Sequence, residues 1–84
     1  MTYSVSIKQS AAKALATIAR DDRLRIIGAI DQLGVNPAAG GVLKGEYAGL
    51  RRIRVGNYRV VYEVQDKKLV ILVIRIGHRR EVYR

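Results

Sequence analysis

The sequence predicts a single α+β domain in the order β-α-α-β-β-β, with a helical hairpin packed on one face of a four-stranded, mainly antiparallel sheet. Three observations support this fold class. The chain has 84 residues, enough for one domain, 1–84, with one core. Its first half places apolar residues at helical spacing. Its second half contains three apolar runs joined by very short turns, which is typical of an antiparallel meander.

The first elements are a strand and two helices. Residues 3–7 alternate apolar and polar side chains, which indicates a half-buried strand. Ser10 is the expected N-cap of the first helix. Asp21 lies at the expected start of the second helix, where a carboxylate meets the positive end of the helix dipole. Gly34 is the expected residue just after that helix, and the short link between the helices predicts an antiparallel hairpin.

The second half of the chain carries most of the charge. Residues 50–84 contain ten Lys and Arg residues and three acidic residues, which accounts for seven of the nine net positive charges. The dipeptide Gly56-Asn57 predicts a two-residue hairpin turn, because both residue types tolerate a positive φ. A second turn is expected around Asp66-Lys67, so three antiparallel strands should follow one another.

Period-2 alternation predicts which side chains share a face of these strands. In the last strand, the even-numbered residues of 70–76 form a larger apolar set than the odd-numbered ones, so we expect the even-numbered side to be buried. Arg75 should then point away from the core. On this interpretation four arginines gather on the sheet face opposite the helices: Arg52, Arg54, Arg59 and Arg75.

Such a cluster favours binding of a polyanion over a mere contribution to solubility. Few acidic residues are interspersed with these arginines, and like charges on adjacent strands repel each other. The chain has one histidine, no cysteine and no nucleotide-binding glycine loop, so we expect no metal and no cofactor. The lack of cysteine predicts a cytoplasmic protein, and no apolar run is long enough to predict a membrane span.

The predicted cluster suits a phosphodiester substrate. Guanidinium groups bind the nonbridging oxygens and stabilise the charge that develops during displacement at phosphorus. Tyr83 offers a ring that can stack on a base, and His78 is a candidate general acid or base because an imidazole can both donate and accept a proton. No metal would be required if the nucleophile were the ribose 2′-hydroxyl.

Three segments also carry a family pattern: LKG (Leu43–Gly45), RRIRVGNYRVVYEV (Arg51–Val64) and VIRIGHRREVY (Val73–Tyr83). Together with the strand–helix–helix opening they cover essentially the whole chain. In these segments the chain resembles the RelE-type toxins of bacterial toxin–antitoxin pairs, which are part of the RelE/ParE superfamily. The resemblance implies a metal-independent endoribonuclease that enters the ribosomal A site and cuts mRNA there, by attack of the 2′-hydroxyl on the neighbouring phosphate.

The resemblance also implies roles for individual residues. Arg52 and Arg54 match two basic positions of the family site. Arg59 would brace the phosphate, and Arg79 would stabilise the transition state or protonate the leaving 5′-oxygen. Tyr83 would stack against the base and orient it.

The resemblance does not assign the general base to one residue. The best-known relative has lysines where this chain has Arg52 and Arg54, and an arginine does not lose its proton in a protein. His78, Tyr83 and a group of the ribosome are the candidates. Further contacts to RNA or the ribosome are expected from Arg51, Arg75, Arg80 and Lys44.

The resemblance implies partners as well. We expect a cognate RelB-like antitoxin, a heterooligomeric complex with it that can bind operator DNA, and the ribosome with its mRNA; no membrane is expected.

Two alternative functions remain. A ParE-type toxin shares the fold but poisons DNA gyrase without nuclease activity, and an inactive binding module would act only with its partner as a DNA-binding repressor. The presence of Arg59, Arg79 and Tyr83 together favours the nuclease.

Overall fold

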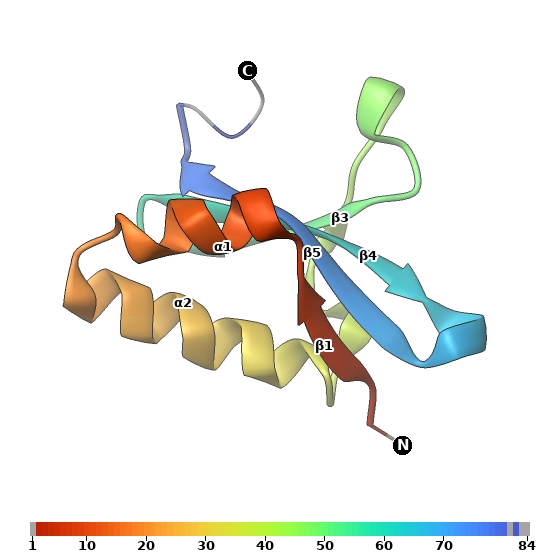
Figure 1. The fold of residues 1–84 in the computed structure, drawn as a ribbon. Coiled ribbons are helices and arrows are strands. Elements are labelled where there is room, and N and C mark those ends of the chain that lie inside the picture. Colours follow the sequence, from red (N-terminus) through yellow and green to blue (C-terminus); the bar gives the residue numbers. More distant parts are fainter. Residues whose placement is uncertain (1, 81, 83–84) are drawn as a thin grey trace.

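Two helices cover one face of a mixed five-stranded sheet (Figure 1). The computed structural model describes residues 2–80 and 82. The helices are α1 (Gln9–Ala16) and α2 (Arg20–Leu33). The strands are β1 (Ser4–Ile7), β2 (Gly41–Val42), β3 (Arg51–Val55), β4 (Tyr58–Gln65) and β5 (Val70–His78). Short 3-10 turns occupy Pro37–Ala39, Gly45–Tyr47 and Asp66–Lys68. No helix among the described residues is long and apolar enough to cross a membrane.

The sheet has the strand order β1-β5-β4-β3-β2, so the N-terminal strand β1 lies next to the last strand, β5. β1 runs parallel to β5, and the other pairs are antiparallel. The predicted α+β class and the helical layer on one face are confirmed. The sheet has five strands instead of the predicted four, because the two residues of β2 pair with Arg51 and Arg52 of β3. A two-residue strand that contains a glycine has no alternation that sequence reasoning could detect.

The helices are built from the apolar stripes seen in the sequence. Ala11 and Leu15 of α1 and Ile26, Ile30 and Leu33 of α2 are buried against the sheet. The acidic start of α2 is confirmed, since Asp21 and Asp22 lie in its first turn. The predicted N-cap was wrong. Ser10 lies inside α1, and the N-cap position is held by Lys8 without a side-chain hydrogen bond.

Gly34 directly follows α2, as predicted, and its lack of a side chain permits a close backbone contact. Its φ is −61°, an ordinary helical value, so no left-handed conformation is involved. A Cβ at this position would lie 2.8 Å from the carbonyl oxygen of Tyr3. The Tyr3 amide donates to the Gly34 carbonyl at 2.7 Å. The glycine therefore allows the chain before β1 to pack directly against the end of α2.

A bulge in β5 determines which of its side chains face the helices. Val61 pairs with Arg75, but the next residue, Tyr62, pairs with Val73, so Ile74 is one extra residue on β5. Ile71, Val73 and Ile76 are all buried in the helix-side core. The prediction that the even-numbered residues of 70–76 form the buried side was therefore wrong for the residues before the bulge, where Ile71 and Val73 are buried, and correct for Ile76 after it. Arg75 points away from the helices as predicted, because the extra residue restores the expected phase.

Candidate functional site

Four arginines share the sheet face opposite the helices, and we refer to them as the arginine face: Arg52, Arg54, Arg59 and Arg75. The strand register places them in two neighbouring rows across the sheet. One row runs Arg54, Arg59, Gly77, and the other runs Arg52, Val61, Arg75. The predicted gathering of these arginines on one face is confirmed. The ladder between β3 and β4 thus supplies the geometry, since alternate residues of each strand point to the same side.

The pair Arg54 and Arg59 is the most unusual feature of this face. The two residues lie directly opposite each other on adjacent strands, where like charges destabilise a sheet. Arg54 is exposed and Arg59 is half-buried. Gly77, which follows Arg59 in the row, adds no side chain, and the backbone of Val82 lies over it. This arrangement suits a bound anion, because its negative charge would offset the repulsion.

Arg59 and Arg79 are both hydrogen-bonded at the turn between β3 and β4. Gly56 in this turn has a φ of +59°, as the predicted hairpin requires. The Arg59 Nη1 atom donates to the carbonyl oxygen of Tyr58 at 3.0 Å and, more weakly, to that of Gly56 at 3.4 Å. The backbone amide of Arg79 donates to the carbonyl oxygen of Asn57 at 2.8 Å. Arg59 and Arg79 are 20 positions apart in the sequence, and both are anchored at the same turn.

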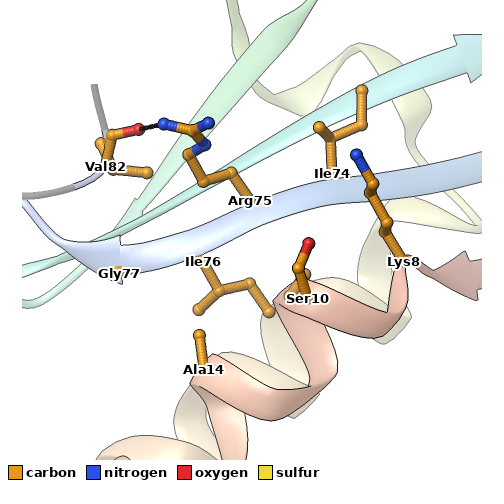
Figure 2. A pocket seen from close by; sticks show the side chains of 9 residues that line it. Lys8, Ser10, Ala14, Ile74, Arg75, Ile76, Gly77 and Val82 are labelled. Atoms are coloured by element: carbon orange, nitrogen blue, oxygen red, sulfur yellow. Dashed lines mark hydrogen bonds between the residues drawn. The ribbon is translucent and has the colours of Figure 1, made fainter. Parts of the chain in front are cut away.

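The segment after β5 folds back over the arginine face. Val82 is only 1% exposed, and its amide donates to the carbonyl oxygen of His78 at 3.2 Å. The Arg75 Nη1 atom donates to the carbonyl oxygen of Val82 at 3.0 Å (Figure 2). Arg80 is exposed, and its amide donates to His78 Nδ1 at 3.3 Å. Tyr83, which was predicted to stack on the base, lies outside the described residues.

His78 is not brought to the arginine face. It pairs with Tyr58, and the two rings meet edge to face at a centroid distance of 6.0 Å and an angle of 81°. The imidazole lines a groove of about 340 Å³ together with Thr17 and Ile18, on the helix side of the sheet. Strand alternation already separates His78 from Arg75 and Gly77. His78 therefore has no place among the groups that can reach a phosphate bound at the arginine face.

Two predicted binding residues lie elsewhere. Arg51 pairs with Tyr62 on the helix side, and its Nη1 atom donates to the Gly40 carbonyl oxygen at 2.8 Å. Lys44 is exposed in the connection between β2 and β3, at the opposite edge of the sheet from β1. The structure thus does not place Arg51 or Lys44 in either row of the arginine face.

The sequence analysis did not predict the contacts of Tyr62 and Gly40 that hold the backbone of β3 at Arg52. The buried hydroxyl of Tyr62 donates to the Pro37 carbonyl oxygen at 2.8 Å and accepts from the Gly40 amide at 2.9 Å. Burial raises the pKa of Tyr62, while the Gly40 amide and the charge of Arg51 lower it in part. A Cβ on Gly40 would lie 2.6 Å from the Arg52 carbonyl oxygen. The tyrosine and the glycine therefore hold the chain before β2 against β3.

The arginine face can bind an anion and stabilise developing negative charge, but it offers no general base. The guanidinium groups stay protonated, and the residues between them are Val61 and Gly77. One carboxylate lies on the same side of the sheet: Glu63, two residues beyond Val61 on β4, whose Oε1 accepts from Gln65 Nε2 at 2.7 Å. Among residues 2–80 and 82, no group of three or more His, Cys, Asp or Glu side chains is arranged to hold a metal ion. The chemistry that these residues support is therefore charge stabilisation at a phosphate.

Comparison with known proteins agrees with the fold. The model of the family described as "ParE toxin of type II toxin-antitoxin system, parDE" matches residues 3–83. Toxin RelG of Mycobacterium tuberculosis (strain ATCC 25618 / H37Rv) is 36% identical over 42 residues. That alignment covers 50% of this chain and 48% of the relative, so it spans about half the length of that curated protein.

Solved structures match over nearly the whole chain. The toxin–antitoxin complex RelBE2 from M. tuberculosis contains a chain with a TM-score of 0.86 and 25% identity, covering 93% of this chain and 99% of that one. The archaeal RelE–RelB complex from Pyrococcus horikoshii OT3 gives a TM-score of 0.80 and 33% identity, covering 98% and 100%. Fold and sequence thus define a toxin of a type II toxin–antitoxin pair. The chain belongs to the ParE toxin family, within the RelE/ParE superfamily that its sequence resembles.

Proposed function

We propose that this protein is a ribosome-dependent endoribonuclease that cuts mRNA in the A site. The observation that carries the proposal is the anchoring of Arg59 and Arg79 at one turn, with Arg54 directly opposite Arg59. Three guanidinium groups from separate positions can then surround one phosphate. Bidentate contacts from such groups favour the extra negative charge that the phosphate acquires in the transition state.

The proposed reaction is an internal displacement. The ribose 2′-oxygen forms a bond to the adjacent phosphorus and loses its proton, while the bond from phosphorus to the 5′-oxygen breaks and that oxygen gains a proton. The products are a 2′,3′-cyclic phosphate and a free 5′-hydroxyl. Arg59 would hold the nonbridging oxygens, Arg79 would stabilise the leaving oxygen, and Arg52 and Arg54 would hold neighbouring charge. Tyr83 would orient the base.

Dependence on the ribosome follows from what the arginine face lacks. General acid–base catalysis is typically worth about 10²–10⁴-fold in rate, and none of the four arginines of this face can supply the base. The ribosome would then contribute the position of the mRNA and a proton acceptor. Free RNA should be cut slowly for the same reason.

The test is to add the purified protein to translating ribosomes and to map the mRNA ends, with free mRNA as the comparison. Cleavage on the ribosome that leaves cyclic phosphate and 5′-hydroxyl ends is expected. Equal rates on free and ribosome-bound mRNA would contradict the ribosome dependence. An absence of cleavage in both samples would reject the nuclease.

A second candidate function has its own support, because the matching family description names ParE. A ParE-type toxin would poison DNA gyrase. A supercoiling assay with purified gyrase, run in parallel with the ribosome assay, separates the two functions. Inhibition of gyrase without any mRNA cleavage would favour this candidate over the nuclease.

The proposed partner is an acidic, RelB-like antitoxin. Both structures described above are complexes of a toxin with its antitoxin. In this chain, the positive charge of the arginine face would attract a segment rich in Asp and Glu, and covering Arg54 and Arg59 would block access of RNA. Co-expression with the neighbouring open reading frame should give a stable complex that does not cut mRNA.

A further inference from the structure

Hydrogen bonds attach the described residues after β5, which are Arg79, Arg80 and Val82, to the rest of the protein. The Arg79 amide donates to Asn57 O at 2.8 Å, and the Val82 amide donates to His78 O at 3.2 Å. The Arg80 amide donates to His78 Nδ1 at 3.3 Å, and Arg75 Nη1 donates to Val82 O at 3.0 Å. The contact made by the Arg75 side chain reaches Val82, the last described residue of the segment. A substitution can therefore remove it without changing the backbone.

Gly77 provides the surface on which this end of the segment rests. A Cβ built on Gly77 would lie 3.9 Å from both the Cα and the N atom of Val82, so the valine backbone lies directly over the glycine. Val82 is 1% exposed. Any side chain much larger than a methyl group at Gly77 would push Val82 away from the sheet.

The side of the segment toward α1 is open. A groove of about 400 Å³ lies between α1 and the end of β5, and its lining includes Ala14 on one side and Arg75 and Val82 on the other (Figure 2). Figure 2 shows the Arg75 guanidinium directed along the strand toward the Val82 carbonyl, away from Lys8. α1 is therefore separated from this part of the segment, and the contacts described above come from β5 and the β3–β4 turn.

We propose that Arg75 is a positioning residue, which holds the segment after β5 so that Arg79 stays at the β3–β4 turn where Arg59 is also anchored. This inference rests on the proposed nuclease function for its effect on rate. It replaces the expectation that Arg75 binds RNA directly. A hydrogen bond from a charged donor is strong enough to shift the population of the ordered segment by about 10–100-fold, and a displacement of about 1 Å in an active site can reduce the rate by about 10².

The first test compares three substitutions of Arg75 by single-turnover cleavage on ribosomes. Arg75→Ala should lower kcat about 10–100-fold with little change in ribosome affinity. Arg75→Gln and Arg75→Lys keep a donor that can reach toward Val82 O, so both should retain more of kcat than the alanine variant. A direct RNA contact predicts a different order. There, Gln would behave like Ala, Lys would be best, and the loss would appear in affinity and in its salt dependence.

A double-variant cycle shows whether Arg75 acts through Arg79. On an Arg79→Ala background, Arg75→Ala should cause little further loss of kcat, because the group that it positions is already gone. Full additivity of the two losses would overturn the positioning role. Lys68→Gln, at the distant turn between β4 and β5, is the matched control for the loss of one positive charge.

The second test follows the segment itself by hydrogen exchange of the Val82 amide. Arg75→Ala and Gly77→Val should both speed exchange, the first by removing the bond and the second by displacing Val82. Gly77→Ala should not, since a methyl group fits at van der Waals distance. Slow Val82 exchange in the wild type without any mRNA cleavage would overturn the nuclease but keep the Arg75 contact. Fast exchange in the wild type, or no change in Arg75→Ala, would overturn the positioning role even in an active enzyme.

Discussion

Replacing Arg54 by Gln should make the free protein more stable and less active. Arg54 lies directly opposite Arg59 on the neighbouring strand. A like-charged pair in this geometry destabilises a sheet by about 0.2–1 kcal/mol. Gln keeps the approximate length and polarity of the side chain but removes the charge. For a domain of this size, 1 kcal/mol shifts Tm by about 4–8 °C, so the expected increase in Tm is about 1–8 °C.

The assay is thermal unfolding at low salt and again near 1 M NaCl, where the Debye length falls to about 3 Å. The gain in Tm should be clear at low salt and nearly absent at high salt. Arg54→Glu should gain more than Arg54→Gln, because repulsion becomes attraction. Lys67→Gln removes a charge from the exposed turn between β4 and β5 and should change Tm little.

Activity should change in the opposite direction. If Arg54 helps to hold the phosphate, its loss removes a charge-assisted contact, and cleavage on ribosomes should fall about 10–100-fold. An Arg54→Gln protein with unchanged or lower Tm at low salt would refute the repulsion argument. A gain of equal size at both salt concentrations would attribute the effect to something other than charge.

Three further predictions concern the same face and its support. Arg59→Ala should reduce ribosomal cleavage by about 10²–10³-fold, and Arg59→Lys should also lose activity because it keeps the charge without the planar fork; single-turnover rates compared with Lys67→Ala test this. Tyr62→Phe should lower the free energy of unfolding by roughly 1–3 kcal/mol in urea titrations, because the Gly40 amide and the Pro37 carbonyl lose their partner. The pKa of Tyr62 is raised in the folded state, so its contribution to stability is fully present at pH values below the unfolded pKa of about 10. The free energy of unfolding should fall as the pH rises above that value, and it should fall less steeply in Tyr62→Phe.

The sequence predicted the class of fold and the arginine face because both depend on simple periodicities. Alternation along β3 and β4 is uninterrupted, so Arg52, Arg54 and Arg59 were assigned to the correct side. In β5 the alternation is interrupted by the extra residue Ile74. Apolar residues on both sides of this strand conceal the bulge, since both sets can be buried. The position of Arg75 was therefore predicted correctly from an incorrect choice of core residues.

Contacts that depend on the path of the backbone could not be predicted. The anchoring of Arg79 at the Asn57 carbonyl requires β5 to lie beside the β3–β4 turn, and no local pattern contains that information. The support from Tyr62 and Gly40 is similar, because 22 residues separate the two partners. His78 is the opposite case. Strand alternation already placed it on the other face from Gly77, which is the helix side. It was included as a candidate only because an imidazole is a common general acid or base.

The charge arrangement gives the free toxin and its proposed antitoxin complex opposite responses to salt. In the free chain, repulsion within the arginine face weakens as salt screens it, so Tm should rise between low salt and about 0.5 M. In the complex, attraction between the same arginines and an acidic partner is screened, so dissociation should become easier and the Tm of the toxin should fall. Measuring both in one salt series separates electrostatic from apolar binding. A complex whose Tm is insensitive to salt would mean that the antitoxin does not contact Arg54 and Arg59, and that its binding rests on another surface.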